Sequence, residues 1–339
     1  MAERRARGSV LAALAVGSAG LVVVALQTAS PTVPVVAPAP SGSVASGVPA
    51  MIAPSSPSAS ASTSPVVSAV TASTLEFAQD ALQDPVVTGR VTGDPGVRVA
   101  AEVLQGGSWV EEAATVTGPD GAFSITLSFG HAEVRTDAWR LVAEGVASPQ
   151  ITVRRLGVAS ATVRPVTRAD VTYSWREGCP VHYSTLRLLD INHYGFDGKM
   201  HRGQLVVQAK VVDRVVALLQ HTIDNRFPIR TMRTIEAFKG SDDASAAADN
   251  TSAFNCRLTT GGTRWSDHAF GVAIDINPVE NPYIDGQILP PAGRDYLDRT
   301  NLRPGMLTEG SPVIVFARAN GWDWLSPHDY QHLEVIGAR

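Results

Sequence analysis

Two histidines and three carboxylates in the C-terminal third of this 339-residue sequence have the types and spacing of a metal-dependent hydrolytic site. His268 and Asp275 stand close together in the segment 266–277, and His332 follows near the end of the sequence. Two histidines and one carboxylate form a common ligand set of catalytic Zn²⁺, which keeps a further position open for water or substrate. We therefore expect His268, Asp275 and His332 to hold one zinc ion.

The remaining two carboxylates flank His332 in the sequence. Asp329 precedes it in the turn expected before a strand, where a carboxylate can take a proton from metal-activated water. Asp329 is therefore predicted to be the general base. Glu334 should share a strand face with His332 and act as its hydrogen-bonding partner behind the ligand set. His328, beside Asp329, is placed outside the ligand set.

Residue alternation predicts the elements that position these side chains. In the segment 272–277 the β-branched residues fall on one strand face, expected to be core, and Asp275 falls on the other. A carboxylate there needs a partner, and Gly271 allows the sharp turn that would bring His268 to face it. The segment 331–336 also alternates as a strand.

A long helix is predicted over residues 208–226, where apolar residues recur with helical period and Phe227-Pro228 ends the pattern. A short strand is predicted over residues 229–233. Strands, a long helix and loops together favour an α+β domain over residues 168–339, built of an antiparallel sheet with helices.

The site residues fall into two motifs, Ser266-x-His268-x-x-Gly271-x-Ala273-x-Asp275 and Asp329-x-x-His332-x-Glu334. Together and in this order, they resemble the zinc D-alanyl-D-alanine carboxypeptidase and L-alanyl-D-glutamate endopeptidase family, which includes VanY-type carboxypeptidases and phage endolysins. The resemblance covers roughly residues 168–339. The segments 250–257 and 277–283 also resemble one branch of this family.

The resemblance implies an arginine that binds the substrate and stabilises the oxyanion. Arg257 is the first choice, because it ends the segment 250–257. Arg233 and Arg230 are rivals, since the family's arginine often follows a strand like the one predicted here. The resemblance also gives Ser266 a role in orienting substrate or a ligand, although stabilising the turn is an equal alternative.

The function that these expectations favour is an exported zinc metallopeptidase that hydrolyses peptide bonds in peptidoglycan stem peptides. Both a D-Ala-D-Ala carboxypeptidase and an L-Ala-D-Glu endopeptidase fit. The alternative from another class is a non-catalytic zinc-containing module for cell-wall binding or signalling, against which the presence of Asp329 argues. A zinc peptidase acting on proteins is a weaker third hypothesis. We expect a monomer.

The N-terminal sequence predicts export. Residues 1–29 combine early arginines with an apolar run, which is typical of a signal peptide but is also near the length of a membrane anchor. Residues 30–73, rich in Pro, Ser and Ala, are predicted to be a disordered linker. We therefore expect an extracytoplasmic protein, secreted or membrane-anchored, at the bacterial cell wall. The net charge of −4 and the lack of nucleic-acid motifs argue against a nucleic-acid partner.

Residues 76–157 are predicted to form a small all-β domain, an immunoglobulin-like sandwich, because short apolar runs alternate with turn signals. Cys179 and Cys256 are the two cysteines of the sequence. In an exported protein such a pair is expected to form a disulfide rather than a redox motif.

Overall fold

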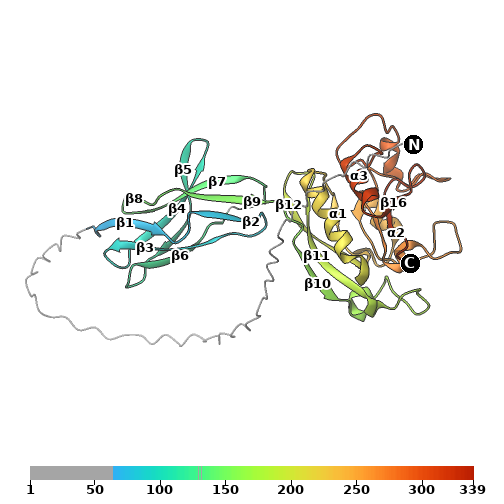
Figure 1. Cartoon of the computed structure of the whole chain (residues 1–339), viewed down its shortest axis with the longest axis horizontal. Coiled ribbons are helices and arrows are strands. Elements are labelled where there is room, and N and C mark those ends of the chain that lie inside the picture. The colour runs from blue at the N-terminus through green and yellow to red at the C-terminus, as the bar shows by residue number, and fades with distance from the viewer. Residues whose placement is uncertain (1–63, 129, 131) are drawn as a thin grey trace, which may run out of the picture. The chain divides into compact units, whose positions relative to one another are not determined.

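The structure is a computed structural model that describes residues 64–128, 130 and 132–339 (Figure 1). The fold is mixed and rich in sheet, with few helices. The predicted signal peptide or anchor, residues 1–29, and the predicted linker up to residue 63 lie outside the described residues. Within the described part of the chain, no helix is long and apolar enough to cross a membrane.

The region following residue 66 contains two β-sheets, and burial alternates clearly along β7, where four of eight residues are buried. One hydrophobic core, which includes Val87, Leu141 and Val153, takes side chains from both sheets. The immunoglobulin-like class remains a prediction. The strands of the first sheet are, in order, β1 (Val67–Ala72), β3 (Val86–Gly93) and β6 (Ala122–Thr126). The second sheet runs β2 (Glu76–Asp80), β9 (Ile151–Leu156), β7 (Thr136–Ala143), β4 (Arg98–Gln105) and β5 (Ser108–Val116), with β8 (Val146–Ala147) on β7.

Strand β1 lies inside the stretch that the sequence predicts as linker, residues 30–73, so the described part of that stretch is not disordered. Its register pairs Val70 with Val91 of β3, and both side chains are buried. The composition of the stretch resembles that of the linker, and the two valines of β1, Val67 and Val70, are three residues apart and do not alternate; the strand forms because β3 supplies a partner.

In the C-terminal region, strands β10 (Ala161–Pro165), β11 (Leu186–Tyr194) and β12 (Met200–Gln208) form an antiparallel sheet. The helix predicted over residues 208–226 is confirmed as a 3₁₀ turn (Ala209–Val211) followed by α1 (Val212–Asp224). Its apolar face carries Val215 and Leu218 into a core shared with Leu189 and Leu205 of the sheet. This packing explains the helical period.

The strand predicted over residues 229–233 is shorter than expected. Only β13 (Thr231–Met232) is a strand, and it pairs in parallel with β14 (Asn250–Thr251), so the sheets of this region are not all antiparallel. The Asn250 side chain accepts a hydrogen bond from the Arg233 amide and donates one to its carbonyl. A side-chain amide thus replaces further strand pairing.

A second antiparallel sheet carries the predicted site, in the order β15 (Ala273–Asp275), β17 (His332–Val335) and β16 (Trp322–Trp324). Helix α3 (Pro312–Ala319) precedes β16, and buried Ile314, Trp322 and Leu333 join the same core as α1. The other helical elements are short: η1 (Arg168–Val171), η2 (Tyr183–Thr185), η4 (Ile235–Phe238), α2 (Asp242–Ala247), η5 (Asp267–Phe270) and η6 (Pro291–Tyr296).

The predicted disulfide between Cys179 and Cys256 is present, with a Cα–Cα separation of 5.9 Å. It lies in a separate buried cluster with Phe254, Leu188 and Val206. The bond joins the loop before β11 to the segment that leads into η5. It therefore constrains chain segments that are far apart in sequence.

Candidate metal centre and catalytic site

The register of β15 and β17 brings the first two predicted ligands together. Asp275 lies directly opposite His332 in the antiparallel pair. Paired residues project from the same sheet face. Asp275 Oδ1 therefore lies 3.1 Å from His332 Nδ1, and both side chains are buried.

The third predicted ligand comes from the turn before β15. His268 lies in η5, which Ser266 caps by accepting a hydrogen bond from the His268 amide at 3.4 Å. Gly271 ends the turn with a φ of +70°, a left-handed conformation that suits glycine. This turn places His268 Nε2 3.1 Å from Asp275 Oδ2 and 3.0 Å from His332 Nδ1.

These three side chains fit a divalent cation. His268 Nδ1 lies 2.6 Å from the Ala253 carbonyl and donates to it, so in the neutral ring Nε2 presents a lone pair to the cluster. Two ligand atoms of a tetrahedral zinc ion, each about 2.0–2.1 Å from the metal, lie about 3.3 Å apart. The separations of 3.0–3.1 Å between these buried atoms are close to that value.

The buried carboxylates of the cluster also favour a positive charge beside them. Burial alone would lower the pKa of His332, but its hydrogen bonds to Asp275 and Glu334 raise it to about 10. Burial opposes ionisation of Asp275, yet His268 and His332 hold its pKa far below the ordinary value. The carboxylates therefore retain a cation beside them, and a metal ion can replace the extra proton.

Glu334 lies behind His332, as the strand alternation predicts. Its Oε2 is 3.4 Å from His332 Nε2, on the side of the ring away from the ligand cluster. Arg339 donates two hydrogen bonds to Asp267 and lies 4.0 Å from Glu334. Such outer partners orient a metal-binding imidazole. Sequence reasoning missed Asp267 and Arg339, and the only signal was the position of Asp267 next to His268.

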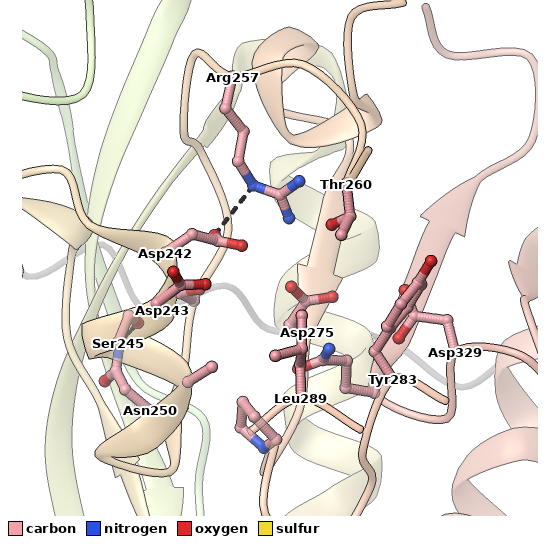
Figure 2. A pocket seen from close by; sticks show the side chains of 14 residues that line it. Asp242, Asp243, Ser245, Asn250, Arg257, Thr260, Asp275, Tyr283, Leu289 and Asp329 are labelled. Atoms are coloured by element: carbon pink, nitrogen blue, oxygen red, sulfur yellow. Dashed lines mark hydrogen bonds and ion pairs between the residues drawn. The ribbon is translucent and has the colours of Figure 1, made fainter. Parts of the chain in front are cut away.

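Asp329 faces the same region from the turn before β17. It lines one cavity together with Asp275 (Figure 2) and a second one together with His332. Its Oδ1 is buried and has no hydrogen-bond partner in the part of the chain that the structure describes. Burial and the negative charge of Asp275 raise its pKa to about 6. A nearby cation would lower this pKa again, so the group would be ionised at neutral pH and able to accept a proton.

Of the three candidate arginines, Arg257 is the one that the structure brings to this region. It lines both cavities, and its Nε lies 2.9 Å from Asp242 Oδ1 (Figure 2). The structure does not bring Arg233 there: it is exposed, with its guanidinium 5.6 Å from the centre of the Phe238 ring. Arg230 instead pairs with Asp249 and Glu280, as described below. Ser266 lines the second cavity as well as capping η5.

Other side chains line the cavity in Figure 2 that sequence reasoning did not single out. Asp242 and Asp243 come from the first turn of α2, and Thr260 from the loop after Arg257. Tyr283 lies within the segment 277–283, which the family resemblance had included, so this one had a sequence signal. Asp242 and Asp243 had no sequence signal of this kind, because only folding of the chain brings them to the site.

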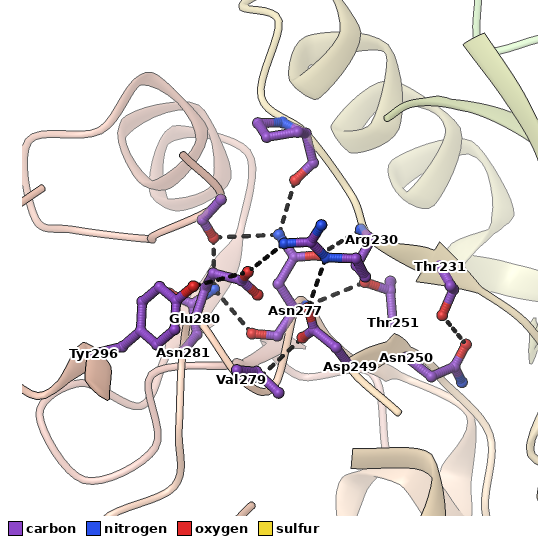
Figure 3. Close-up of polar contacts among 12 residues, drawn as sticks. Arg230, Thr231, Asp249, Asn250, Thr251, Asn277, Val279, Glu280, Asn281 and Tyr296 are labelled. Atoms are coloured by element: carbon purple, nitrogen blue, oxygen red, sulfur yellow. Dashed lines mark hydrogen bonds and ion pairs between the residues drawn. The ribbon is translucent and has the colours of Figure 1, made fainter. Parts of the chain in front are cut away.

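A polar network, in which the exposed Arg230 meets buried carboxylates, supports the chain just after β15 (Figure 3). Asn277, at a φ of +45°, accepts a hydrogen bond from the Arg230 amide at 3.0 Å and donates to the Pro228 carbonyl at 2.8 Å. The Arg230 guanidinium lies 2.9 Å from Glu280 and 3.3 Å from Asp249. Burial and the neighbouring Asp249 raise the pKa of Glu280 to about 7. The network holds the segment that follows Asp275.

Comparison with known proteins supports the region that carries this site. Residues 260–335 match the model of the D-alanyl-D-alanine carboxypeptidase family, and this span includes His268, Asp275, Asp329 and His332. No curated protein matches the chain. Among solved structures, a marsupial T cell receptor aligns with 42% of this chain and 89% of its own, at 9% identity and a TM-score of 0.21. A score this low carries no argument about the fold.

The matched family is one of peptidases, which supports a hydrolase, and the cluster of His268, Asp275 and His332 fits the metal dependence expected of it. The resemblance to D-alanyl-D-alanine carboxypeptidases that the sequence motifs indicate is therefore confirmed over residues 260–335.

Proposed function

We propose that this chain is an exported zinc peptidase that hydrolyses peptide bonds in peptidoglycan stem peptides. One observation carries the proposal: the metal-ligating atoms of His268, Asp275 and His332 lie within 3.1 Å of one another, beside Asp329 Oδ1, which has no hydrogen-bond partner among the described residues. The match to a carboxypeptidase family over the same residues supports the choice of substrate.

In this proposal each side chain has a distinct role. His268, Asp275 and His332 would hold the zinc ion, which supplies Lewis-acid polarisation of a carbonyl and activation of water. Asp329 accepts a proton from the attacking water at Oδ1 and returns it to the leaving amine. Arg257 donates hydrogen bonds to the carbonyl oxygen as negative charge develops on it.

The proposed location rests on the predicted signal and on the disulfide. Disulfides persist in oxidising compartments outside the cytosol, and Cys179–Cys256 is consistent with one. The protein would be secreted, or anchored in the membrane through residues 1–29. A monomer remains our expectation.

The direct test is digestion of purified peptidoglycan by the zinc-loaded full chain, followed by mass spectrometry of the products. Free D-Ala would identify a D-Ala-D-Ala carboxypeptidase, and a cut beside L-Ala would identify an L-Ala-D-Glu endopeptidase. A chelator should abolish either product. If wild-type protein releases nothing but is retained on the purified wall, the non-catalytic wall-binding alternative gains support and the peptidase proposal is wrong.

The variant Asp329→Asn tests the role of the base. Loss of a general base typically costs about 10²–10⁴ in rate, so turnover should fall by that factor while bound zinc stays at the wild-type level. Asp323→Asn is a matched control, because Asp323 is an exposed aspartate on the neighbouring strand β16. Equal turnover by Asp329→Asn and wild type would remove Asp329 from the mechanism.

A further inference from the structure

The backbone that carries Arg257 is tied to a distant loop by the disulfide. Cys256 immediately precedes Arg257 and is buried. Its amide donates to the Ser174 carbonyl at 2.9 Å, and its carbonyl accepts from Arg176 Nη1 at 2.7 Å. Together with the bond to Cys179, these hydrogen bonds give Cys256 three separate contacts with the segment 174–179.

The loop that follows is closed onto the ligand-bearing turn. The Ser266 amide donates to the Arg257 carbonyl at 3.1 Å, and Leu258 forms an antiparallel bridge with Trp265. Ser266 in turn caps η5, which carries His268. The loop is therefore anchored at one end by the disulfide and at the other end by η5, the turn that carries the predicted zinc ligand His268.

The Arg257 side chain has a separate anchor on α2. Asp242 Oδ1 lies 2.9 Å from Arg257 Nε, and it also accepts a hydrogen bond from Asn255 Nδ2 at 3.4 Å. Figure 2 shows this ion pair with the guanidinium lying over the cavity that Asp275 and Asp329 line. Backbone and side chain of Arg257 are thus fixed by different parts of the chain.

We propose that the Cys179–Cys256 disulfide and Asp242 are positioning elements for Arg257, so that turnover depends on the oxidised disulfide. This inference rests on the proposed function. An arginine that stabilises developing charge must be placed accurately, since a displacement of about 1 Å can cost about 100-fold in rate. The zinc ligands lie on η5, β15 and β17, but His268 also bonds to the Ala253 carbonyl, three residues before Cys256, so bound zinc is measured together with turnover.

A double-mutant cycle tests whether the disulfide acts through Arg257. The paired change Cys179→Ala with Cys256→Ala is made in the wild type and in Arg257→Ala, and kcat and KM are measured with a stem peptide. We expect kcat to fall by about 10–100-fold in the wild-type background and by less than about 3-fold in Arg257→Ala. Equal factors in both backgrounds would overturn the proposal.

Asp242→Asn provides a second variant that leaves the disulfide intact, in case the cysteine variant does not fold. Its effect on kcat should likewise disappear when Arg257 is replaced by alanine. Asp213→Asn is the matched control, because Asp213 also lies in the first turn of a helix, α1, but does not line the cavity, and it should leave kcat unchanged. An additive effect of Asp242→Asn and Arg257→Ala contradicts the positioning role.

One readout does not depend on turnover. Reduction of the native full chain with a phosphine reductant, which lacks the zinc-binding thiols of dithiothreitol, should raise hydrogen exchange of the backbone amides in residues 257–266. Unchanged exchange would overturn the positioning role. A wild-type protein without turnover, in which exchange nevertheless rises on reduction, would contradict the proposed peptidase function and leave the positioning role supported.

Discussion

Replacing Glu280 with glutamine should remove a pH-dependent loss of stability that arises in the polar network next to the predicted metal site. The Glu280 side chain is 1% exposed, and burial together with the neighbouring Asp249 raises its pKa from 4.5 to about 7. Arg230 lies 2.9 Å from it and also serves Asp249, so one guanidinium is shared by two buried carboxylates. Glutamine keeps the shape and can still accept from Arg230, but it does not titrate.

The direction in which the free energy of unfolding changes with pH follows from proton binding to Glu280. Between pH 4.5 and about 7 the folded protein keeps the Glu280 proton, whereas the unfolded chain has released it. The free energy of unfolding must therefore fall as pH rises through this window, and the contribution is fully present only below pH 4.5. At about 1.4 kcal/mol per pKa unit, the loss is about 3 kcal/mol as an upper limit.

The assay is urea denaturation of the metal-free full chain at several pH values from 4.5 to 8. The difference in unfolding free energy between Glu280→Gln and wild type should shift in favour of the variant by about 2–3 kcal/mol across this range. Glu309→Gln is the control, because Glu309 is an exposed carboxylate whose pKa is lowered by Arg318, so it titrates below the window. A Glu280→Gln difference that does not change with pH would refute the reasoning.

Two further variants test the site and the turn that positions it. Asp275→Asn should weaken zinc affinity by more than about 100-fold, measured by competition with a chromogenic chelator, since a neutral amide replaces the only charged ligand; wild-type affinity would remove Asp275 from the ligand set. Gly271→Ala should lower the free energy of unfolding by about 1–3 kcal/mol in urea, because alanine at a φ of +70° is strained and its Cβ would lie 2.9 Å from the Gln208 amide nitrogen. An unchanged urea midpoint would contradict that account.

The local pattern of apolar residues was sufficient to predict the helix and strands that carry the site. The period of apolar residues predicted α1, and alternation predicted strands around Asp275 and His332. These patterns are readable because each element buries one face, so the spacing of apolar residues reports its geometry. The same reasoning failed for β1, where composition resembled the linker and the partner strand was not visible in the sequence.

The arginines illustrate where sequence reasoning stops. Arg230, Arg233 and Arg257 all lay near suitable motifs, and only the resemblance of the segment 250–257 to the family made Arg257 the first choice. The folded chain separates them by their contacts: Arg230 pairs with two buried carboxylates, Arg233 lies 5.6 Å from the centre of the Phe238 ring, and Arg257 is held over the cavity by Asp242. Such pairings join distant segments and depend on how loops close.

The sequence by itself therefore predicted His268, Asp275, Asp329 and His332 as the residues for metal binding and proton transfer, because their types and their positions in strands and turns are local properties. The tertiary structure decided how they meet. It set the register that places Asp275 opposite His332 and the turn that brings His268 within 3.1 Å of both. Register and turn placement follow from packing between segments, which no single stretch of sequence contains.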